Sequence, residues 1–171
     1  MKSIPYALTA VLLVFTLCQP AQAGNVTLGY TGGSAEASDN TLFDNASGAA
    51  FFVGYQSEYL FGFEFGVFAI VDEHSDTTTT DDVTLGGRSL TLTFTVPLGF
   101  ISVFGRGGIA DWALYLDEQK IDDGHSATYG GGLDFYFNER WAARVEQQRF
   151  IDIGPSEMEI IHTRLGIVYT F

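Results

Sequence analysis

The sequence predicts an all-β fold: an eight-stranded antiparallel transmembrane β-barrel with short periplasmic turns and four longer extracellular loops. Three observations predict it. Apolar and polar residues alternate with period two along most of the chain, without helical periodicity. After the N-terminal segment, no stretch approaches the about 18 apolar residues of a membrane-spanning helix. Aromatic residues gather in two bands, at opposite ends of the expected strands. Inside hydrocarbon every backbone polar group needs an internal partner, so a closed barrel is the alternative to helices.

Residues 1–23 have the features of a signal peptide. Lys2 supplies a positive start, residues 6–17 are mostly apolar, and Ala21-Gln22-Ala23 has the small-x-small pattern of a cleavage site. We expect cleavage after Ala23, which leaves residues 24–171 as one barrel domain. The single cysteine, Cys18, leaves with the signal peptide, so we expect no disulfide or thiol chemistry.

The exported part of the chain is strongly acidic. All 21 acidic residues follow residue 23, whereas Lys2, one of the eight basic residues, lies before it. This charge argues against nucleic acid as a partner. It suits a surface that meets cations or lipopolysaccharide bridged by divalent ions.

The expected strands and their connections follow a fixed alternation. The strands cover residues 25–31, 48–58, 61–71, 83–96, 100–116, 125–137, 141–151 and 160–171. Long polar connections at 32–47, 72–82, 117–124 and 152–159 alternate with tight ones around 59–60, 97–99 and 138–140. Outer-membrane barrels of bacteria sort their connections in this way, with both termini on the periplasmic side.

The alternation also predicts which face meets lipid. In the third strand Phe61, Phe63 and Phe65 share one face, whereas Gly62, Glu64 and Gly66 share the other. A soluble barrel would turn the apolar face inward. Two aromatic bands favour a lipid-facing barrel instead. One band contains Tyr59, Phe61, Phe100, Phe135, Phe137, Trp141, Tyr169 and Phe171, and the other contains Tyr30, Phe51, Trp112, Tyr115 and Phe150.

In the fifth strand the apolar phase is expected to switch past Gly108. Trp112, Leu114 and Leu116 then belong to the apolar, lipid-facing row. The same switch would turn Asp111 toward the lumen.

The C-terminal part resembles small outer-membrane barrel proteins, namely the OmpA transmembrane domain and the OmpX-like and opacity-type proteins. The segments that carry the resemblance are Tyr129 to Phe137, Trp141 to Glu146 and Arg164 to Phe171. The resemblance implies an eight-stranded barrel in the bacterial outer membrane. It also implies that the assembly machinery reads the last strand through the apolar row Leu165, Ile167, Tyr169 and Phe171. Such barrels serve as adhesins, structural proteins, narrow pores and enzymes, so function stays open.

Six charged residues fall on the expected lumen face: Glu64, Arg106, Asp134, Arg144, Glu146 and Arg164. The turns would set Asp134 beside Arg144, Glu146 beside Arg164, and Arg106 beside Asp134, with Glu64 on the opposite wall. An eight-stranded barrel is just filled by side chains, so these charges must be paired. They form either a structural plug or a gate that opens for small ions by exchanging partners.

Other candidate sites lie toward the loop end. Arg88 and Arg149 could contact lipopolysaccharide phosphates or be merely solvated. Asp72-Glu73-His74-Ser75-Asp76 could hold a cation, although its spacing fits no calcium loop. His125 and Ser126 are adjacent, so on a strand they point to opposite faces and make a poor catalytic pair.

We therefore expect a non-enzymatic, monomeric outer-membrane barrel without cofactors. Its role would be envelope integrity or surface interaction through acidic extracellular loops, with outer-membrane lipid, lipopolysaccharide and the assembly machinery as partners. A narrow gated ion pore is the first alternative, and a lipid-A-modifying enzyme is the second.

Overall fold

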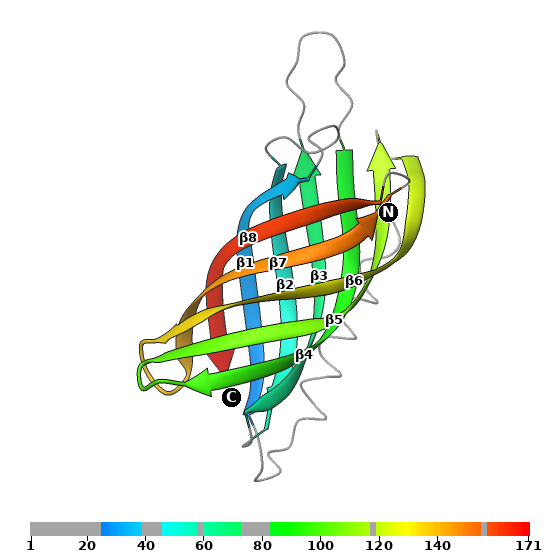
Figure 1. Cartoon of the computed structure of the whole chain (residues 1–171). Helices are drawn as coiled ribbons and strands as arrows, with labels where there is room; N and C mark the ends of the chain where they lie inside the picture. The colour runs from blue at the N-terminus through cyan, green and yellow to red at the C-terminus, as the bar shows by residue number, and fades with distance from the viewer. Residues whose placement is uncertain (1–24, 39–45, 58–59, 73–82, 117–118, 155–156) are drawn as a thin grey trace, which may run out of the picture.

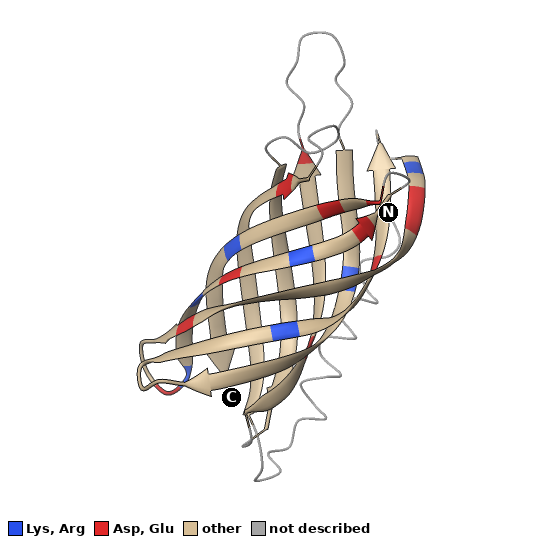
Figure 2. Cartoon of the chain, in the orientation of Figure 1, with Lys and Arg blue, Asp and Glu red and all other residues tan. Residues whose placement is uncertain are grey.

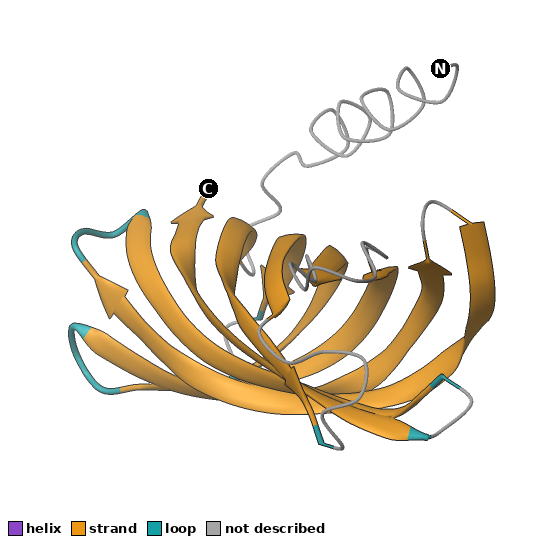
Figure 3. Ribbon diagram, turned by 90° about the horizontal axis from the view of Figure 1, so that it is seen from above, coloured by secondary structure: helices purple, strands orange, loops and turns teal. Residues whose placement is uncertain are grey.

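The computed structural model describes residues 25–38, 46–57, 60–72, 83–116, 119–154 and 157–171, and its ordered elements are eight strands (Figures 1 and 3). They are β1 (Asn25–Ala37), β2 (Ala46–Gln56), β3 (Phe61–Asp72), β4 (Val83–Pro97), β5 (Ile101–Leu116), β6 (Gln119–Tyr136), β7 (Trp141–Ile153) and β8 (Met158–Thr170). None of the described residues forms a helix long and apolar enough to cross a membrane. The expected signal peptide at residues 1–23 and most of the loop at 72–82 lie outside the described residues.

The eight strands close into one antiparallel barrel, because β1 pairs with β8 as well as with β2. The pairing can be followed once around the wall. It starts at Phe94 on β4 and passes through Gly105, Gly131, Gln147, Thr163, Ser34, Ser47 and Val71 before it returns to β4 at Thr84. The offset between start and end tilts the strands against the barrel axis, as closure requires.

The outer wall carries the apolar rows that the alternation predicts. On β3 and β4 the side chains of Phe61, Phe63, Leu90 and Leu92 are exposed, Leu92 to 74%. An outer surface with so many exposed apolar side chains requires lipid around it. At the short-turn end, Tyr169 packs edge-on against both Trp141 and Phe171, with ring centroids 4.8 and 4.9 Å apart. This confirms the aromatic band at that end.

The tight turn between β6 and β7 is built by Asn138. Its side-chain oxygen accepts hydrogen bonds from the backbone N–H groups of Arg140 and Trp141, at 2.8 and 2.9 Å. This local hydrogen bonding is typical of asparagine in turns. The turn fixes the register that sets Asp134 opposite Arg144.

At the loop end, several sequence predictions are wrong. The connection expected at 117–124 is mostly strand, because β6 begins at Gln119. The apolar phase of β5 does not switch either. Trp112 and Leu114 are buried inside the barrel, whereas Asp111 faces outward and pairs with Arg88.

Phe150 on β7, expected in the outer aromatic band, is likewise fully buried. The physical reason is that the strands continue beyond the apolar band. Above that band the outer wall is polar and the interior is apolar, so the rule that apolar side chains face outward no longer holds.

Candidate functional site

The middle of the barrel interior holds three arginines and three carboxylates, all buried. They come from five strands: Glu64 from β3, Arg106 from β5, Asp134 from β6, Arg144 and Glu146 from β7, and Arg164 from β8. These are the six residues that the alternation places on the lumen face. Their formal charges balance, so the cluster can be dry without a net buried charge. Figure 2 shows the strand positions of the charged residues, including those at the loop end.

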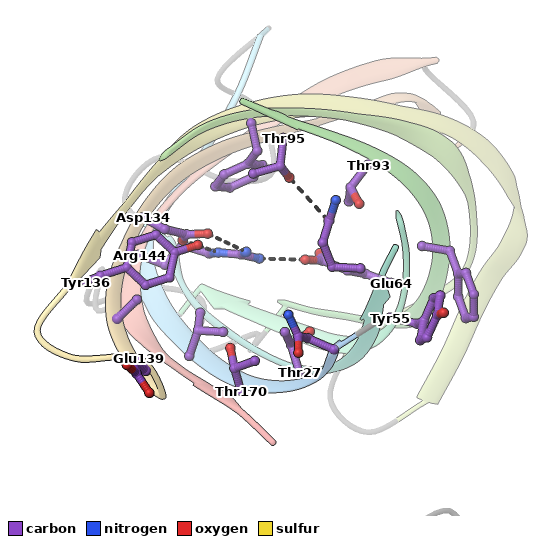
Figure 4. Close-up of a pocket in the computed structure, with 16 residues that line it drawn as sticks. Thr27, Tyr55, Glu64, Thr93, Thr95, Asp134, Tyr136, Glu139, Arg144 and Thr170 are labelled. Atoms are coloured by element: carbon purple, nitrogen blue, oxygen red, sulfur yellow. Dashed lines mark hydrogen bonds and ion pairs between the residues drawn. The ribbon is translucent and has the colours of Figure 1, made fainter. Parts of the chain in front are cut away.

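Arg144 is the hub of the half of the cluster nearer the turns (Figure 4). Its Nε and Nη2 donate to the two oxygens of Asp134, at 2.7 and 3.0 Å. Its Nη1 donates to Glu64 Oε1 at 2.8 Å, across the lumen. A two-pronged arginine–carboxylate pair is among the strongest hydrogen-bonded arrangements in proteins. The guanidinium group also lies over the rings of Phe52 and Phe104, 4.7 and 4.3 Å from their centroids.

The other half of the cluster is centred on Glu146. Arg164 donates to Glu146 Oε1 at 2.7 Å, and Arg106 contacts the second oxygen. Arg106 also donates from Nη1 to Glu64 Oε2 at 3.0 Å, and so joins the two halves. The six side chains therefore form one connected network.

One expected pair is wrong. The sequence predicts Arg106 beside Asp134, but the residue opposite Arg106 on β6 is Gly130, and Asp134 lies opposite Ser102. The polar residues between these strands predict a longer connection than the structure has, because β5 ends at Leu116 and β6 begins at Gln119. The pairs Asp134–Arg144 and Glu146–Arg164 lie directly opposite each other, as expected.

Three polar side chains that the sequence did not single out extend the network. Gln148 accepts a hydrogen bond from Arg164 and donates from Nε2 to the Thr128 hydroxyl at 2.8 Å. Thr31 donates to Glu146 Oε1 at 3.3 Å. All three are in phase with the inward charges, which is the signal that could have found them.

Above the charged network, toward the loops, the interior is apolar. Its buried side chains come from every strand except β6 and pack as one cluster: Ala35, Ala37, Ala46, Ala50, Phe68, Ile70, Val83, Leu85, Ala110, Trp112, Leu114, Phe150, Ile153, Met158 and Ile160. The rings of Phe68 and Phe150 lie 4.6 Å apart at its centre. His162 is fully buried in the same part of the lumen. We call this cluster the apolar layer.

Below the network, a cavity of about 140 Å³ opens at the short-turn end (Figure 4). Hydroxyl and amide side chains line much of it, among them Thr27, Gln56, Thr93 and Thr95. Asp134, Glu64 and Arg144 form its floor. A second cavity of about 10 Å³, within the network, has room for about one water molecule. The interior is thus a polar vestibule that ends on a charged layer, with an apolar layer beyond.

On the outer wall, charged residues follow directly above the apolar band. Arg88 donates from Nε to Asp111 Oδ2 at 2.8 Å, and His125 Nδ1 lies 2.5 Å from Asp111 Oδ1. Farther around, Arg149 donates to Glu159 at 2.9 Å. Both arginines expected at the rim therefore face outward.

Catalytic geometry is not evident in these residues. Ser126 points inward and is buried, whereas its neighbour His125 is exposed on the outer wall, so the two do not form a nucleophile–base pair. Within the described ranges, no group of three or more His, Cys, Asp or Glu side chains could hold a metal ion.

A closed eight-stranded antiparallel wall, apolar outside and charged within, defines the class of small outer-membrane barrels. The sequence matches the family "Outer membrane protein beta-barrel domain" over residues 7–171, and the chain belongs to this family. It is therefore a protein of the bacterial outer membrane. Small barrels of this family are typically non-enzymatic. Among curated proteins, no sequence matches.

Several solved structures share the fold. Neisserial surface protein A is 9% identical, with a TM-score of 0.68, over 86% of this chain and 97% of that chain. Ail, the attachment invasion locus protein of Yersinia pestis, is 16% identical, with a TM-score of 0.61, over 87% and 98%. OprG from Pseudomonas aeruginosa is also 16% identical, with a TM-score of 0.61, over 87% and 96%. At these identities the likeness shows the fold alone.

Proposed function

We propose that the protein is a sealed, non-conducting envelope barrel that acts through its extracellular side. The observation that carries this proposal is the two-layer filling of the lumen. An ion that enters from the periplasmic vestibule meets the paired charges of Arg144 and Glu64, and then the apolar layer around Phe150. Exchanging ion-pair partners would open only the first of these barriers.

Conductance in planar bilayers tests this proposal. We expect no channel events from the wild type or from Arg144→Ala, because Phe68 and Phe150 still close the lumen above the altered site. The double variant Arg144→Ala/Phe150→Ala breaches both layers and is the variant most able to conduct. Stable channels in the wild type would overturn the proposal. Channels in Arg144→Ala alone would favour the gated pore, in which the charged network is the only gate.

We further propose that lipopolysaccharide phosphates contact Arg88 and Arg149. The Arg88 side chain is 66% exposed and lies directly above the apolar outer row, where a headgroup would meet it. Arginine is well suited to phosphate recognition. The variant Arg88→Gln/Arg149→Gln should bind purified lipopolysaccharide more weakly than wild type, and dephosphorylated lipopolysaccharide should remove the difference. Arg140→Gln, at the opposite rim, is the matched control; an equal loss there would contradict the assignment.

The last strand carries the proposed contact with the assembly machinery. Leu165 and Ile167 on β8, and Phe171 directly after it, form an exposed outward row. Phe171→Ala should lower the amount of barrel that reaches the outer membrane, measured by mobility in SDS gels before and after heating. Phe137→Ala, another exposed aromatic at the same end, is the control. Equal losses in the two variants would mean that the aromatic band matters, not the apolar row of the last strand.

The enzymatic alternative has a direct test. Under the present proposal, lipid A from cells with and without the protein gives identical mass spectra. A new lipid A species that depends on His125, the exposed histidine on the outer wall, would favour a lipid-A-modifying enzyme instead.

A further inference from the structure

The polar vestibule at the short-turn end is large enough for a small ligand. Its volume of about 140 Å³ has room for several water molecules, or for a molecule of a few non-hydrogen atoms. Threonines from three strands line its wall: Thr27 on β1, Thr93 and Thr95 on β4, and Thr170 on β8. Figure 4 shows these four side chains around the cavity, with the charged network as its floor.

The hydroxyl group of Thr93 has no partner within the part of the chain that the structure describes. The residue is only 5% exposed, and its side chain lines the cavity. Thr95, two residues along, differs because its hydroxyl donates to Gln56 Oε1 at 3.3 Å. Buried polar groups are almost always hydrogen-bonded, to protein or to a bound molecule. The Thr93 hydroxyl is therefore positioned to bind a molecule inside the cavity.

The floor of the vestibule offers acceptors rather than donors. Arg144 uses its Nε and both of its Nη atoms on Asp134 and Glu64, so its guanidinium group is already engaged. Each carboxylate oxygen has two lone pairs, and each oxygen of Asp134 accepts one hydrogen bond from Arg144. A ligand that donates hydrogen bonds finds oxygens there, whereas a ligand that only accepts them faces carboxylates.

The charge of the lining also favours a cation. The six charges of the network balance, and Glu139 at the mouth of the vestibule adds a negative charge. Among the described residues Glu139 has no ion-pair partner, because Arg140 beside it donates instead to the Tyr169 hydroxyl at 3.4 Å. A cleft with an excess of one charge concentrates ions of the opposite sign.

We propose that the vestibule binds a small primary ammonium group that enters from the periplasmic side. The nitrogen donates to the Thr93 hydroxyl and to carboxylate oxygens of the floor, and Glu139 attracts the cation at the mouth. An ammonium group has three donors and no acceptor, which matches this set of oxygens. The inference goes beyond the proposed function, since it concerns the end opposite the loops and holds whether or not the lumen conducts ions.

Three matched solutes test the charge of the ligand. The mature chain in phosphatidylcholine nanodiscs is titrated with ethanolamine, ethylene glycol and glycolate, which share a two-carbon chain. We expect only ethanolamine to shift the methyl NMR signals of Thr27, Thr93 and Thr170, whereas Thr163, exposed on the outer wall, should not respond. Equal shifts from ethanolamine and ethylene glycol would overturn the assignment of an ammonium site. No shift with any solute would mean that the vestibule holds water only, and would overturn it as well.

Two substitutions locate the site. Thr93→Val keeps the shape of the side chain and should weaken ethanolamine about two- to tenfold through one lost hydrogen bond. Glu139→Gln should weaken it about two- to fivefold, as expected for a partly solvated charge. Glu36→Gln makes the same charge change at the loop end and should have no effect. Equal effects of the two charge variants would mean general attraction to an acidic protein and would overturn the proposal.

A primary ammonium group is carried both by free amines and by the headgroup of phosphatidylethanolamine. The same titration in nanodiscs that contain this lipid separates the two sources. Threonine signals that are already shifted before ethanolamine is added identify the headgroup as the occupant. Signals that shift only on addition identify the free amine.

Discussion

The middle and the upper part of the lumen are filled by side chains of opposite chemistry. In the middle, Arg144 and Glu146 belong to a balanced network in which each charge contacts at least one opposite charge. Above it, Phe68 and Phe150 belong to a cluster without a charged member. Both layers exclude ions, but for different reasons. The charged layer has no open path while its pairs hold, and the apolar layer offers an ion no ligand at all.

The two layers should also fail differently. A buried ion pair contributes little net stability over an apolar replacement. Removing one partner is nevertheless costly, because it leaves the other charge buried without a partner. An apolar cluster loses stability in proportion to the volume removed. The charged layer therefore enforces one strand register, whereas the apolar layer contributes stability in small, separable amounts.

The largest loss of stability is expected from a substitution in the charged layer. Glu146→Leu leaves Arg106 and Arg164 without the carboxylate that joins them. We expect the free energy of unfolding to fall by about 3–5 kcal/mol, measured by urea titration in lipid vesicles. Glu139→Leu, in the exposed turn between β6 and β7, is the control and should change little. A small loss in Glu146→Leu would mean that water reaches the network.

A substitution in the apolar layer is expected to lower the free energy of unfolding somewhat less. Phe150→Ala removes a fully buried ring that packs on Phe68, and we expect a loss of about 3 kcal/mol in the same titration. Ile121→Ala, on the exposed tip of β6, serves as the control for an apolar truncation. If both variants lose equally little stability, the apolar layer is loosely packed and would not seal the lumen.

The same contrast explains what the sequence could predict. Alternation assigns residues to two faces, and within the apolar band the lipid decides which face is outside. That was enough to place Glu64, Arg144 and Arg164 in the lumen. Above the band no lipid is present, and alternation alone does not say which face is inside. Trp112 and Phe150 were therefore assigned to the wrong face, and so was Asp111.

The error on Arg106 has a different origin. Its partner depends on where the β5–β6 hairpin turns, and the polar residues from Gln119 to Gly124 were interpreted as a loop although they form strand. A shift in register moves every cross-strand neighbour. Pairs across the tight turn at Asn138 were predicted because a turn of fixed geometry leaves no such freedom.

Adjacent glycines on β5 test how closely the wall is packed next to the charged layer. A Cβ at Gly108 would lie 2.0 Å from the backbone oxygen of Leu90, whereas at Gly107 the nearest atom is 4.0 Å away. Gly108→Ala should therefore cost about 1–3 kcal/mol, and Gly107→Ala should be close to neutral, by the urea titration above. Similar losses in both variants would show that the close approach of the Leu90 backbone is not what makes the substitution at Gly108 costly.

The smallest change in stability is expected at the ion pair on the outer wall, which has the same chemistry as the pairs in the lumen. Arg88–Asp111 has the same nitrogen–oxygen contact as Arg144–Asp134, at 2.8 against 2.7 Å, but the Arg88 side chain is 66% exposed. Water and salt screen such a pair, and exposed pairs contribute little to stability. Arg88→Gln should leave the urea midpoint unchanged, whereas Arg144→Gln should lower it clearly. If the two variants were equally destabilised, burial would not be what makes the lumen network costly to break, and the distinction between a screened rim and a dry interior would fail.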